Sequence, residues 1–320
     1  MVIRALIQAL PGSLVKFFAR PYVAGDSLES AVDVARQLYD ERGVLTTLDL
    51  LQENVEEQAQ VEDACQVYRQ MVEAAAAFPE GDLRPTLSLK PSSYTTRPLE
   101  RGEGMDAAGS EDAVRMIVQY AGEKGVPVTC DMEDRHWTEW TLDLVNRLWE
   151  EGHRHLGVVL QARLERTEKD LQRIPIGMRV RLVIGIYLEP VSVATQDKTV
   201  MKERLLRFAK ILLERGNYVE FATHDEAYVR RFLTEVVPAT GVSSDRYEVQ
   251  MLYGVPRDKL VQELRAGKVG DGGPVKVRSY VPFATSWKHA IAYCRRRLME
   301  NPSIASAVTR NILRGMIGRS

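Results

Sequence analysis

The chain has 320 residues, 45% of them hydrophobic, which is enough to bury either the cores of two ordinary domains or one barrel-sized core. Basic and acidic residues nearly balance, and the formal net charge of −1 provides no long-range field that would attract nucleic acid. The sequence also lacks a block of like charges that could serve as a binding tail, so we expect no nucleic-acid partner.

The N-terminal segment, residues 1–43, is expected to form a helical extension ahead of the main domain. Its first apolar residues fall on one helical face, which predicts either a helix docked on the protein or a helix lying on a membrane surface. Arg4 and Pro11 interrupt the apolar run, which is too short for a transmembrane span. We therefore expect a cytoplasmic protein, with peripheral contact at the inner face of the membrane as the second interpretation.

Short apolar or β-branched runs then alternate with helical stretches along the chain. Eight such runs are present, at residues 44–50, 85–90, 126–132, 155–161, 180–186, 218–223, 247–252 and 275–281. Strands that alternate with helices indicate βαβ units and a parallel sheet, and eight units favour a closed barrel. The sequence therefore predicts an α/β fold, a (β/α)8 TIM-type barrel over residues 44–302, followed by a helical tail at 303–320.

Capping signals mark several of the intervening helices. Ser27 is expected to cap the helix that ends at Gly43, and Ser110 is expected to cap the helix that ends at Gly125. Residues 92–109 contain several glycines and no sustained period, so we expect a long loop over the barrel mouth.

The cysteines and histidines give no sign of a metal site. Cys65, Cys130 and Cys294 are widely separated and lack the CxxC spacing, so they are interpreted as reduced cytosolic thiols. His153 and His155 stand just before an apolar run, where a polar turn is expected. No metal ligand is assigned.

Polar side chains follow nearly every predicted strand, at the end where barrels of this type carry their chemistry. The residues expected at these carboxyl ends of the strands are Asp49, Lys90, Asp131, Gln161, Tyr187, Thr223, His224, Gln250 and Tyr280. The sequence has no phosphate-binding glycine loop and no GxSxG elbow, which weakens nucleotide hydrolase and esterase interpretations. Amide groups, an arginine at position 181 and hydroxyl or imidazole donors form a set that suits a flavin.

The last predicted strand leads into a helix that carries Tyr293, Arg296, Arg297 and Glu300. Two adjacent arginines can bind a small carboxylate in a forked geometry while the aromatic ring lines the site. A solvated basic helix face is the alternative interpretation of this segment alone.

Seven ordered blocks of the sequence resemble the proline dehydrogenase family, in its monofunctional bacterial branch. The blocks are LSLK (87–90), CDMED (130–134), VVLQARLERTEKDL (158–171), RLVIGIYLEP (181–190), EFATHD (220–225), EVQMLYGV (248–255), and YVP (280–282) with YCRRRLMEN (293–301). The resemblance implies a distorted barrel whose last helix sits over bound FAD.

By the same resemblance, the chain oxidises L-proline to 1-pyrroline-5-carboxylate through hydride transfer from C5 to the flavin N5, and electrons pass to a quinone. A separate pyrroline-5-carboxylate dehydrogenase is expected downstream, because the sequence contains no aldehyde dehydrogenase module.

The resemblance also assigns residues to two roles. The substrate and catalytic set is Lys90, Asp131, Arg181, Tyr280, Tyr293, Arg296 and Arg297. The cofactor set is Asp131, Gln161, Arg181, Val183, Gly185, Tyr187, Lys198, Thr223, His224, Gln250, Leu252, Arg297 and Glu300.

Departures from the family's pattern leave two other functions open. Ile184 and Ile186 stand where the family has lysine and alanine, and Phe283 and Ala284 replace Tyr and Gly. A third arginine, Arg295, adjoins the pair. The alternatives are a flavin-dependent dehydrogenase of a related cyclic or N-substituted amino acid, such as hydroxyproline, and a catalytically silent barrel that acts as a binding protein.

Overall fold

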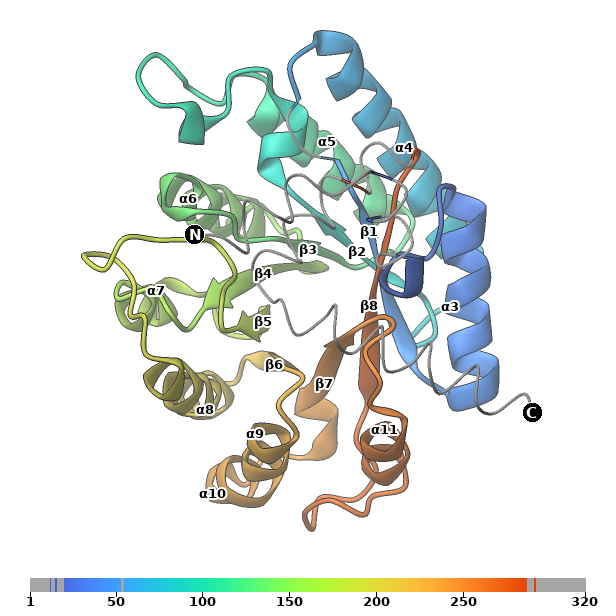
Figure 1. The fold of residues 1–320 in the computed structure, drawn as a ribbon, viewed down its shortest axis with the longest axis vertical. Helices are drawn as coiled ribbons and strands as arrows, with labels where there is room; N and C mark the ends of the chain where they lie inside the picture. The colour runs from blue at the N-terminus through green and yellow to red at the C-terminus, as the bar shows by residue number, and fades with distance from the viewer. Residues whose placement is uncertain (1–11, 13–14, 16–19, 53–54, 287–290, 292–320) are drawn as a thin grey trace.

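Eight parallel strands close into a barrel in the computed structural model, which describes residues 12, 15, 20–52, 55–286 and 291 (Figure 1). The strands follow one another around the barrel in chain order, and the last pairs with the first. They are β1 (Leu45–Leu50), β2 (Thr86–Leu89), β3 (Val128–Cys130), β4 (Leu156–Gln161), β5 (Arg179–Val183), β6 (Tyr218–Ala222), β7 (Tyr247–Leu252) and β8 (Val277–Phe283). The predicted barrel is confirmed.

Helices surround the barrel on its outside (Figure 1). Those that follow the strands are α4 (Gln58–Ala76), α5 (Ser110–Glu123), α6 (Arg135–Glu150), α7 (Thr167–Arg173), α8 (Lys198–Glu214), α9 (Glu226–Arg231), α10 (Val237–Thr240) and α11 (Asp258–Arg265). A π-helical turn, Phe232–Val236, joins α9 to α10. Short 3-10 helices lie at Arg20–Tyr22, Pro91–Tyr94, Leu99–Arg101 and Ser244–Arg246.

The helix α3 (Leu28–Arg42) precedes every strand, yet it packs against both β1 and β8. It covers the place where the first and last strands meet. The described part of the expected N-terminal extension is thus packed onto the barrel wall. Most of residues 1–19, the predicted final helix and the predicted tail at 303–320 lie outside the described residues.

The capping signals are confirmed at one helix and wrong in part at the other. The Ser27 hydroxyl accepts from the Ser30 N–H, and Gly43 ends α3 with a φ of 56°. Ser110, however, is the first residue of α5, and the cap position belongs to Gly109, whose φ of 83° lies in the left-handed region. The Ser110 hydroxyl instead donates to the Pro91 carbonyl at 2.7 Å, so it ties α5 to the segment after β2.

The two faces of the strands bury different chemistry. Outward residues such as Leu48, Val158 and Phe283 are apolar and form the core between the barrel wall and the helices. Inward residues two positions apart on each strand are largely polar, because the side-chain period of a strand is two. Among the described residues, the inward or mouth-facing ionic groups include the cations Lys90, Arg179, Arg181 and Arg278 and the anions Asp49, Asp131, Glu220 and Glu248.

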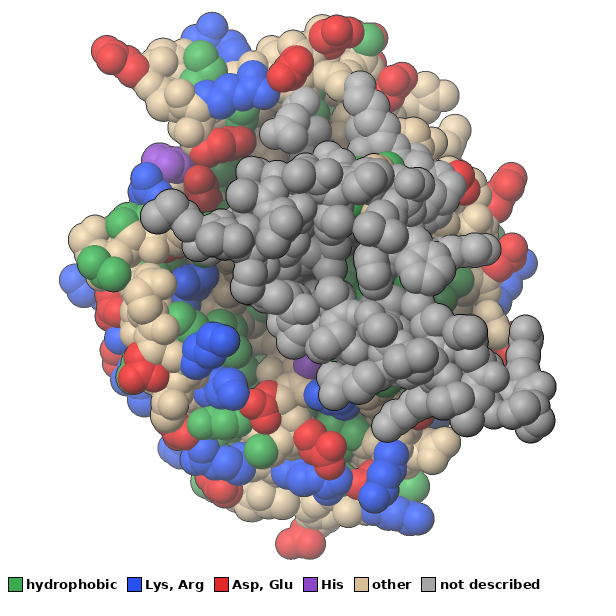
Figure 2. Space-filling model, in the orientation of Figure 1, with side chains coloured by type: hydrophobic (Ala, Val, Ile, Leu, Met, Phe, Trp, Pro, Cys, Tyr) green, Lys and Arg blue, Asp and Glu red, His purple; other side chains and the backbone are tan. Residues whose placement is uncertain are grey.

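The molecular surface agrees with the small net charge. On the face seen in Figure 2, basic and acidic side chains are interspersed along the rim over α8 to α11. Surface pairs there include Arg231 with Glu203 and Arg230 with Glu263. Among the described helices, none combines the length and the apolar character that crossing a bilayer requires.

Candidate functional site

Asp131, directly after β3, is the centre of a hydrogen-bond network at the barrel mouth. Its Oδ1 accepts from Arg181 Nη1 at 2.9 Å and from Ser88 Oγ at 2.8 Å. Its Oδ2 accepts from the Tyr280 hydroxyl at 2.8 Å and lies 3.8 Å from Lys90 Nζ. The structure therefore brings together the four members of the predicted catalytic set that it describes.

Arg181 is held from several sides by this network. Its Nε donates to Gln250 Oε1 at 2.7 Å and lies 3.4 Å from Glu220 Oε2, while its guanidinium stands 5.1 Å from the centre of the Tyr280 ring. Burial opposes the charged form, but Glu220 and Asp131 raise the pKa of Arg181 above its usual value. Its Nη2 is buried and has no hydrogen-bond partner within the described part of the chain.

A buried ion pair between Glu248 and Arg278, deeper in the barrel than Gln250, orients the amide of Gln250. Gln250 Nε2 donates to Glu248 Oε1 at 2.6 Å, and Arg278 binds both oxygens of Glu248, at 2.6 and 3.0 Å. Because Glu248 can only accept, the amide oxygen of Gln250 must face Arg181. Sequence reasoning missed this pair. The signal for it is the side-chain period of two along a strand. This period places Glu248 on the same face as Gln250, and Arg278 on the same face as Tyr280.

Lys90 follows β2 and pairs with Asp49 on the neighbouring strand β1. Asp49 stands in the sequence at a strand end, but the resemblance gave it no role. Burial and the nearby Asp131 raise the pKa of Asp49, and Lys90 acts in the opposite direction.

The cofactor residues predicted on β4 and β5 also lie at the mouth. Gln161 Nε2 donates to the Glu133 carbonyl at 2.8 Å, and the Tyr187 carbonyl accepts from the Arg163 guanidinium. Gly185 has a φ of 100°, and a Cβ there would stand 2.6 Å from Gln161 Oε1. Only glycine allows the backbone to approach that closely. Val183, the last residue of β5, is half-buried beside it.

A second group of predicted cofactor residues lies after β6 and at the end of β7. His224 Nε2 accepts from the Leu252 N–H at 2.8 Å, so its ring is neutral and carries its proton on Nδ1. Thr223 Oγ1 accepts from the Asp225 N–H at 3.2 Å. Lys198 is different, because it is the exposed first residue of α8, and no hydrogen bond or ion pair among the described residues joins it to the others.

The predicted residues of the final helix are not placed. Tyr293, Arg296, Arg297 and Glu300 lie outside the described residues, as does Arg295. Their roles stay predictions.

Phe283, which stands on β8 where the family has tyrosine, does not narrow the barrel mouth. Tyr280 points inward, so Phe283, three residues later, points outward, and it is fully buried in the core behind the wall. Ile184 and Ile186 are half-buried on either side of Gly185.

Glu133 is a buried carboxyl group beside this site, only 6% exposed. It accepts from the Ser92 N–H at 2.9 Å and from the Ser92 hydroxyl. Burial outweighs these hydrogen bonds and raises the pKa of Glu133 from 4.5 to about 7. The group therefore changes its charge close to neutral pH.

The raised pKa makes the stability of the fold depend on pH at this position. The folded chain keeps the Glu133 proton that an unfolded chain loses near pH 4.5, so the contribution is fully present below that pH and is lost as the pH rises through about 7. From about pH 5 to pH 8, wild type should lose about 2–3 kcal/mol of unfolding free energy relative to Glu133→Gln. Urea unfolding across this range measures the difference, and a constant difference would contradict the expectation.

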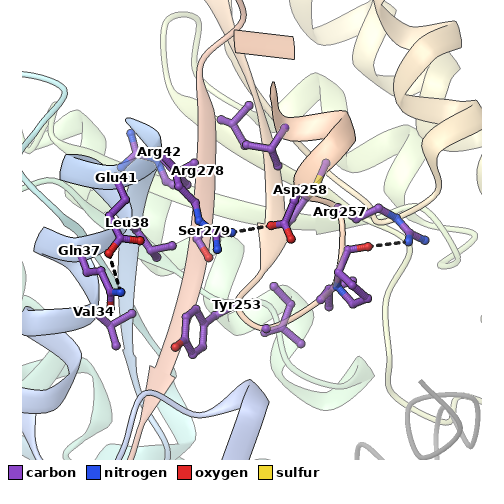
Figure 3. Close-up of a pocket in the computed structure, with 18 of the residues that line it drawn as sticks. Val34, Gln37, Leu38, Glu41, Arg42, Tyr253, Arg257, Asp258, Arg278 and Ser279 are labelled. Carbon is purple, nitrogen blue, oxygen red and sulfur yellow. Dashed lines mark hydrogen bonds and ion pairs between the residues drawn. The ribbon is translucent and has the colours of Figure 1, made fainter. Parts of the chain in front are cut away.

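A cavity of about 330 Å³ lies on the outside of the barrel, between α3, β8 and the segment that joins β7 to α11 (Figure 3). Val34 and Leu38 of α3, Tyr253 and Ser279 are among the residues that line it. Of the predicted site residues that the structure describes, Leu252 alone lines it. The cavity is thus separate from the network around Asp131.

Two features of the mouth fit a flavin. The orphaned Nη2 of Arg181 is a buried cationic donor that needs an acceptor such as a ring nitrogen. Gly185 lets the backbone after β5 pack directly against Gln161, which belongs to the predicted cofactor set. Amide, hydroxyl and imidazole groups from β4, β6 and β7 surround the same mouth.

The family model and the relatives that match this chain carry the same name, and they match it over most of its length. A family model described as proline dehydrogenase matches residues 31–310. Proline dehydrogenase of Deinococcus radiodurans is 34% identical over 317 residues, covering 98% of this chain and 95% of the relative. Proline dehydrogenase 1 of Bacillus subtilis strain 168 is 33% identical over 297 residues, covering 92% and 91%.

Two solved structures with the same fold are those of longer proteins. Proline utilization A from Bdellovibrio bacteriovorus, inactivated by N-propargylglycine, has a TM-score of 0.77 and 22% identity, and the match covers 89% of this chain and 32% of that one. A bifunctional proline utilization A protein has a TM-score of 0.73 and 18% identity, covering 91% and 32%. This chain spans about a third of each of them.

Proposed function

The chain belongs to the proline dehydrogenase family, and from this premise we propose that it is an FAD-dependent enzyme that oxidises L-proline to 1-pyrroline-5-carboxylate in proline catabolism. Arg181 carries the proposal. Its buried guanidinium is fixed by Asp131, Glu220 and Gln250, and it keeps one donor unused at the mouth where the substrate and a flavin would meet.

FAD would be held by residues at the ends of β4 to β7 and on the final helix. Those proposed are Asp131, Gln161, Arg181, Val183, Gly185, Tyr187, Lys198, Thr223, His224, Gln250, Leu252, Arg297 and Glu300. Bound FAD would supply the two-electron acceptor for the hydride of the substrate C5, and a quinone would take up these electrons. Arg181 Nη2 would donate to the flavin N5 and favour the reduced, anionic form.

The substrate end would be built by Lys90, Asp131 and Tyr280 together with Tyr293, Arg296 and Arg297. A forked arginine pair orients the proline carboxylate, and the aromatic rings exclude water from the reacting carbon. The amine must release a proton to solvent before or during hydride loss, and nearby cations lower its pKa. Since the Lys90 charge is paired with Asp49, we assign that effect chiefly to the arginines.

The visible spectrum of the purified protein tests cofactor and substrate together. We expect flavin absorption that is bleached when L-proline is added without oxygen, followed by reduction of a quinone analogue. Protein that is colourless and cannot be reconstituted with FAD would overturn the proposal. Bleaching by hydroxyproline in place of proline would select the related dehydrogenase, and flavin that no amino acid in such a panel reduces would select the silent barrel.

We also propose a quinone as the acceptor in the cell and a separate pyrroline-5-carboxylate dehydrogenase as the enzyme that consumes the product. Peripheral contact with the membrane through the N-terminal segment would bring the flavin close to such a quinone. The family resemblance supports the first two points, and the apolar face of residues 2–10 supports the third.

A further inference from the structure

Asp49 is a fully buried carboxylate that the proposed reaction leaves without a task. It lies on the inner face of β1 and is 0% exposed. Its Oδ1 accepts from Lys90 Nζ, and its Oδ2 has no hydrogen-bond partner within the described residues. Burying a carboxylate is costly unless its charge is matched, so its burial here needs a reason.

The geometry around Lys90 supplies that reason. Asp49 pairs in register with Ser88, two residues before Lys90, and so lies one layer below the lysine on the adjacent strand. A lysine ammonium sits on a long flexible stem and reaches for water unless it is held.

Asp131 is a poor alternative partner for the lysine. It stands 3.8 Å from Lys90 Nζ and already accepts from Arg181, Ser88 and Tyr280. Of the two carboxylates that form ion pairs with Lys90 among the described residues, Asp49 is the one that can be committed to it.

We propose that Asp49 is a positioning residue that holds the Lys90 ammonium at the substrate end of the mouth. Held there, Lys90 does not compete with Arg181 and Tyr280 for the oxygens of Asp131. Asp49 then acts on the reaction through Lys90. This role rests on the proposed function, since it concerns where Lys90 stands relative to bound proline.

A double-mutant cycle tests this dependence. Asp49→Asn should lower kcat/KM for L-proline by about 100-fold in the wild-type background, the loss typical of a misplaced active-site group. In the Lys90→Met background the same change should alter kcat/KM by less than about 3-fold, because the group through which Asp49 acts is gone. Equal losses in the two backgrounds would overturn the inference.

Matched variants separate positioning from loosening of the barrel. Thr47 lies two residues earlier on the same face of β1, is 0% exposed, and shares a 2.7 Å hydrogen bond with Thr86. Thr47→Val should leave kcat/KM within about 3-fold of wild type, and a loss as large as that of Asp49→Asn would count against positioning.

A second variant covers the case in which Asp49→Asn does not fold. Asp49→Glu keeps the charge but moves the carboxylate by one methylene, so we expect a loss of about 10-fold that again disappears in the Lys90→Met background. A wild-type protein that does not oxidise L-proline overturns the proposed function, and this inference with it, before any variant is compared. An active wild type with additive variants overturns this inference alone.

Discussion

The Arg181→Lys variant is expected to lose about 100-fold or more in kcat/KM for L-proline, the size found when one preorganised donor is removed from an active site. Lysine keeps the positive charge but cannot reproduce a planar fork that serves Asp131, Glu220 and Gln250 together and still leaves a donor over. Dye reduction at saturating and limiting proline measures the loss, and flavin content per polypeptide shows whether cofactor is retained.

Arg179 provides the matched control for this expectation. It lies two residues earlier on β5 and pairs with the same Glu220 at 3.0 Å, but it is one layer deeper and donates to the backbone carbonyls of Val128 and His155. Arg179→Lys should lower stability while leaving kcat/KM within about 3-fold of wild type. Equal losses of kcat/KM in the two variants would show that Arg181 supports activity only by stabilising the barrel, and not through a specific role at the mouth.

The Arg278→Met variant is expected to lose about 3–5 kcal/mol of unfolding free energy. Arg278 and Glu248 are both buried, so removal of the arginine leaves an uncompensated carboxylate inside the barrel. Arg278 holds the pKa of Glu248 below its usual value against the opposing effect of burial. Urea unfolding at neutral pH measures the loss.

Two further variants give this prediction its controls. Arg231 and Glu203 form a comparable pair on the surface, with side chains 36% and 49% exposed, and Arg231→Met should cost less than about 1 kcal/mol. Arg278→Met combined with Glu248→Met should recover much of the loss, because no charge is then left unpaired. A single Arg278→Met variant as stable as the surface variant would contradict the expectation.

The barrel could be predicted from the sequence because each strand is short, apolar on its outer face and followed by a helix with recognisable stops. The ends of the strands do not follow from the local pattern in the same way. The last strand runs from Val277 to Phe283, two residues beyond the range expected, since it pairs with β1 as far as Leu50. Such register comes from pairing partners distant in the chain, which local patterns do not contain.

A place at the barrel mouth could be predicted for residues that directly follow a strand, as with Lys90 and Asp131. The ion pairs below them could not be predicted, although Glu220, Glu248 and Arg278 follow the strand period. Most residues in their runs are apolar, and the sequence alone does not say which charges meet inside the barrel. Which helix covers the seam between β8 and β1 is likewise settled by packing of α3 and not by chain order.

The position of α3 has a consequence for how the chain reaches its folded state. Arg278 on β8 donates to the carbonyl of Thr46 on β1, 232 residues away in sequence, and α3 covers this same seam. Closing so long a loop is slow, because the chain loses conformational entropy before the stabilising contact forms. During synthesis α3 is made before β1 to β8, and it packs on both the first and the last of these strands. Part of its apolar face therefore stays without its packing partner until β8 has been synthesised.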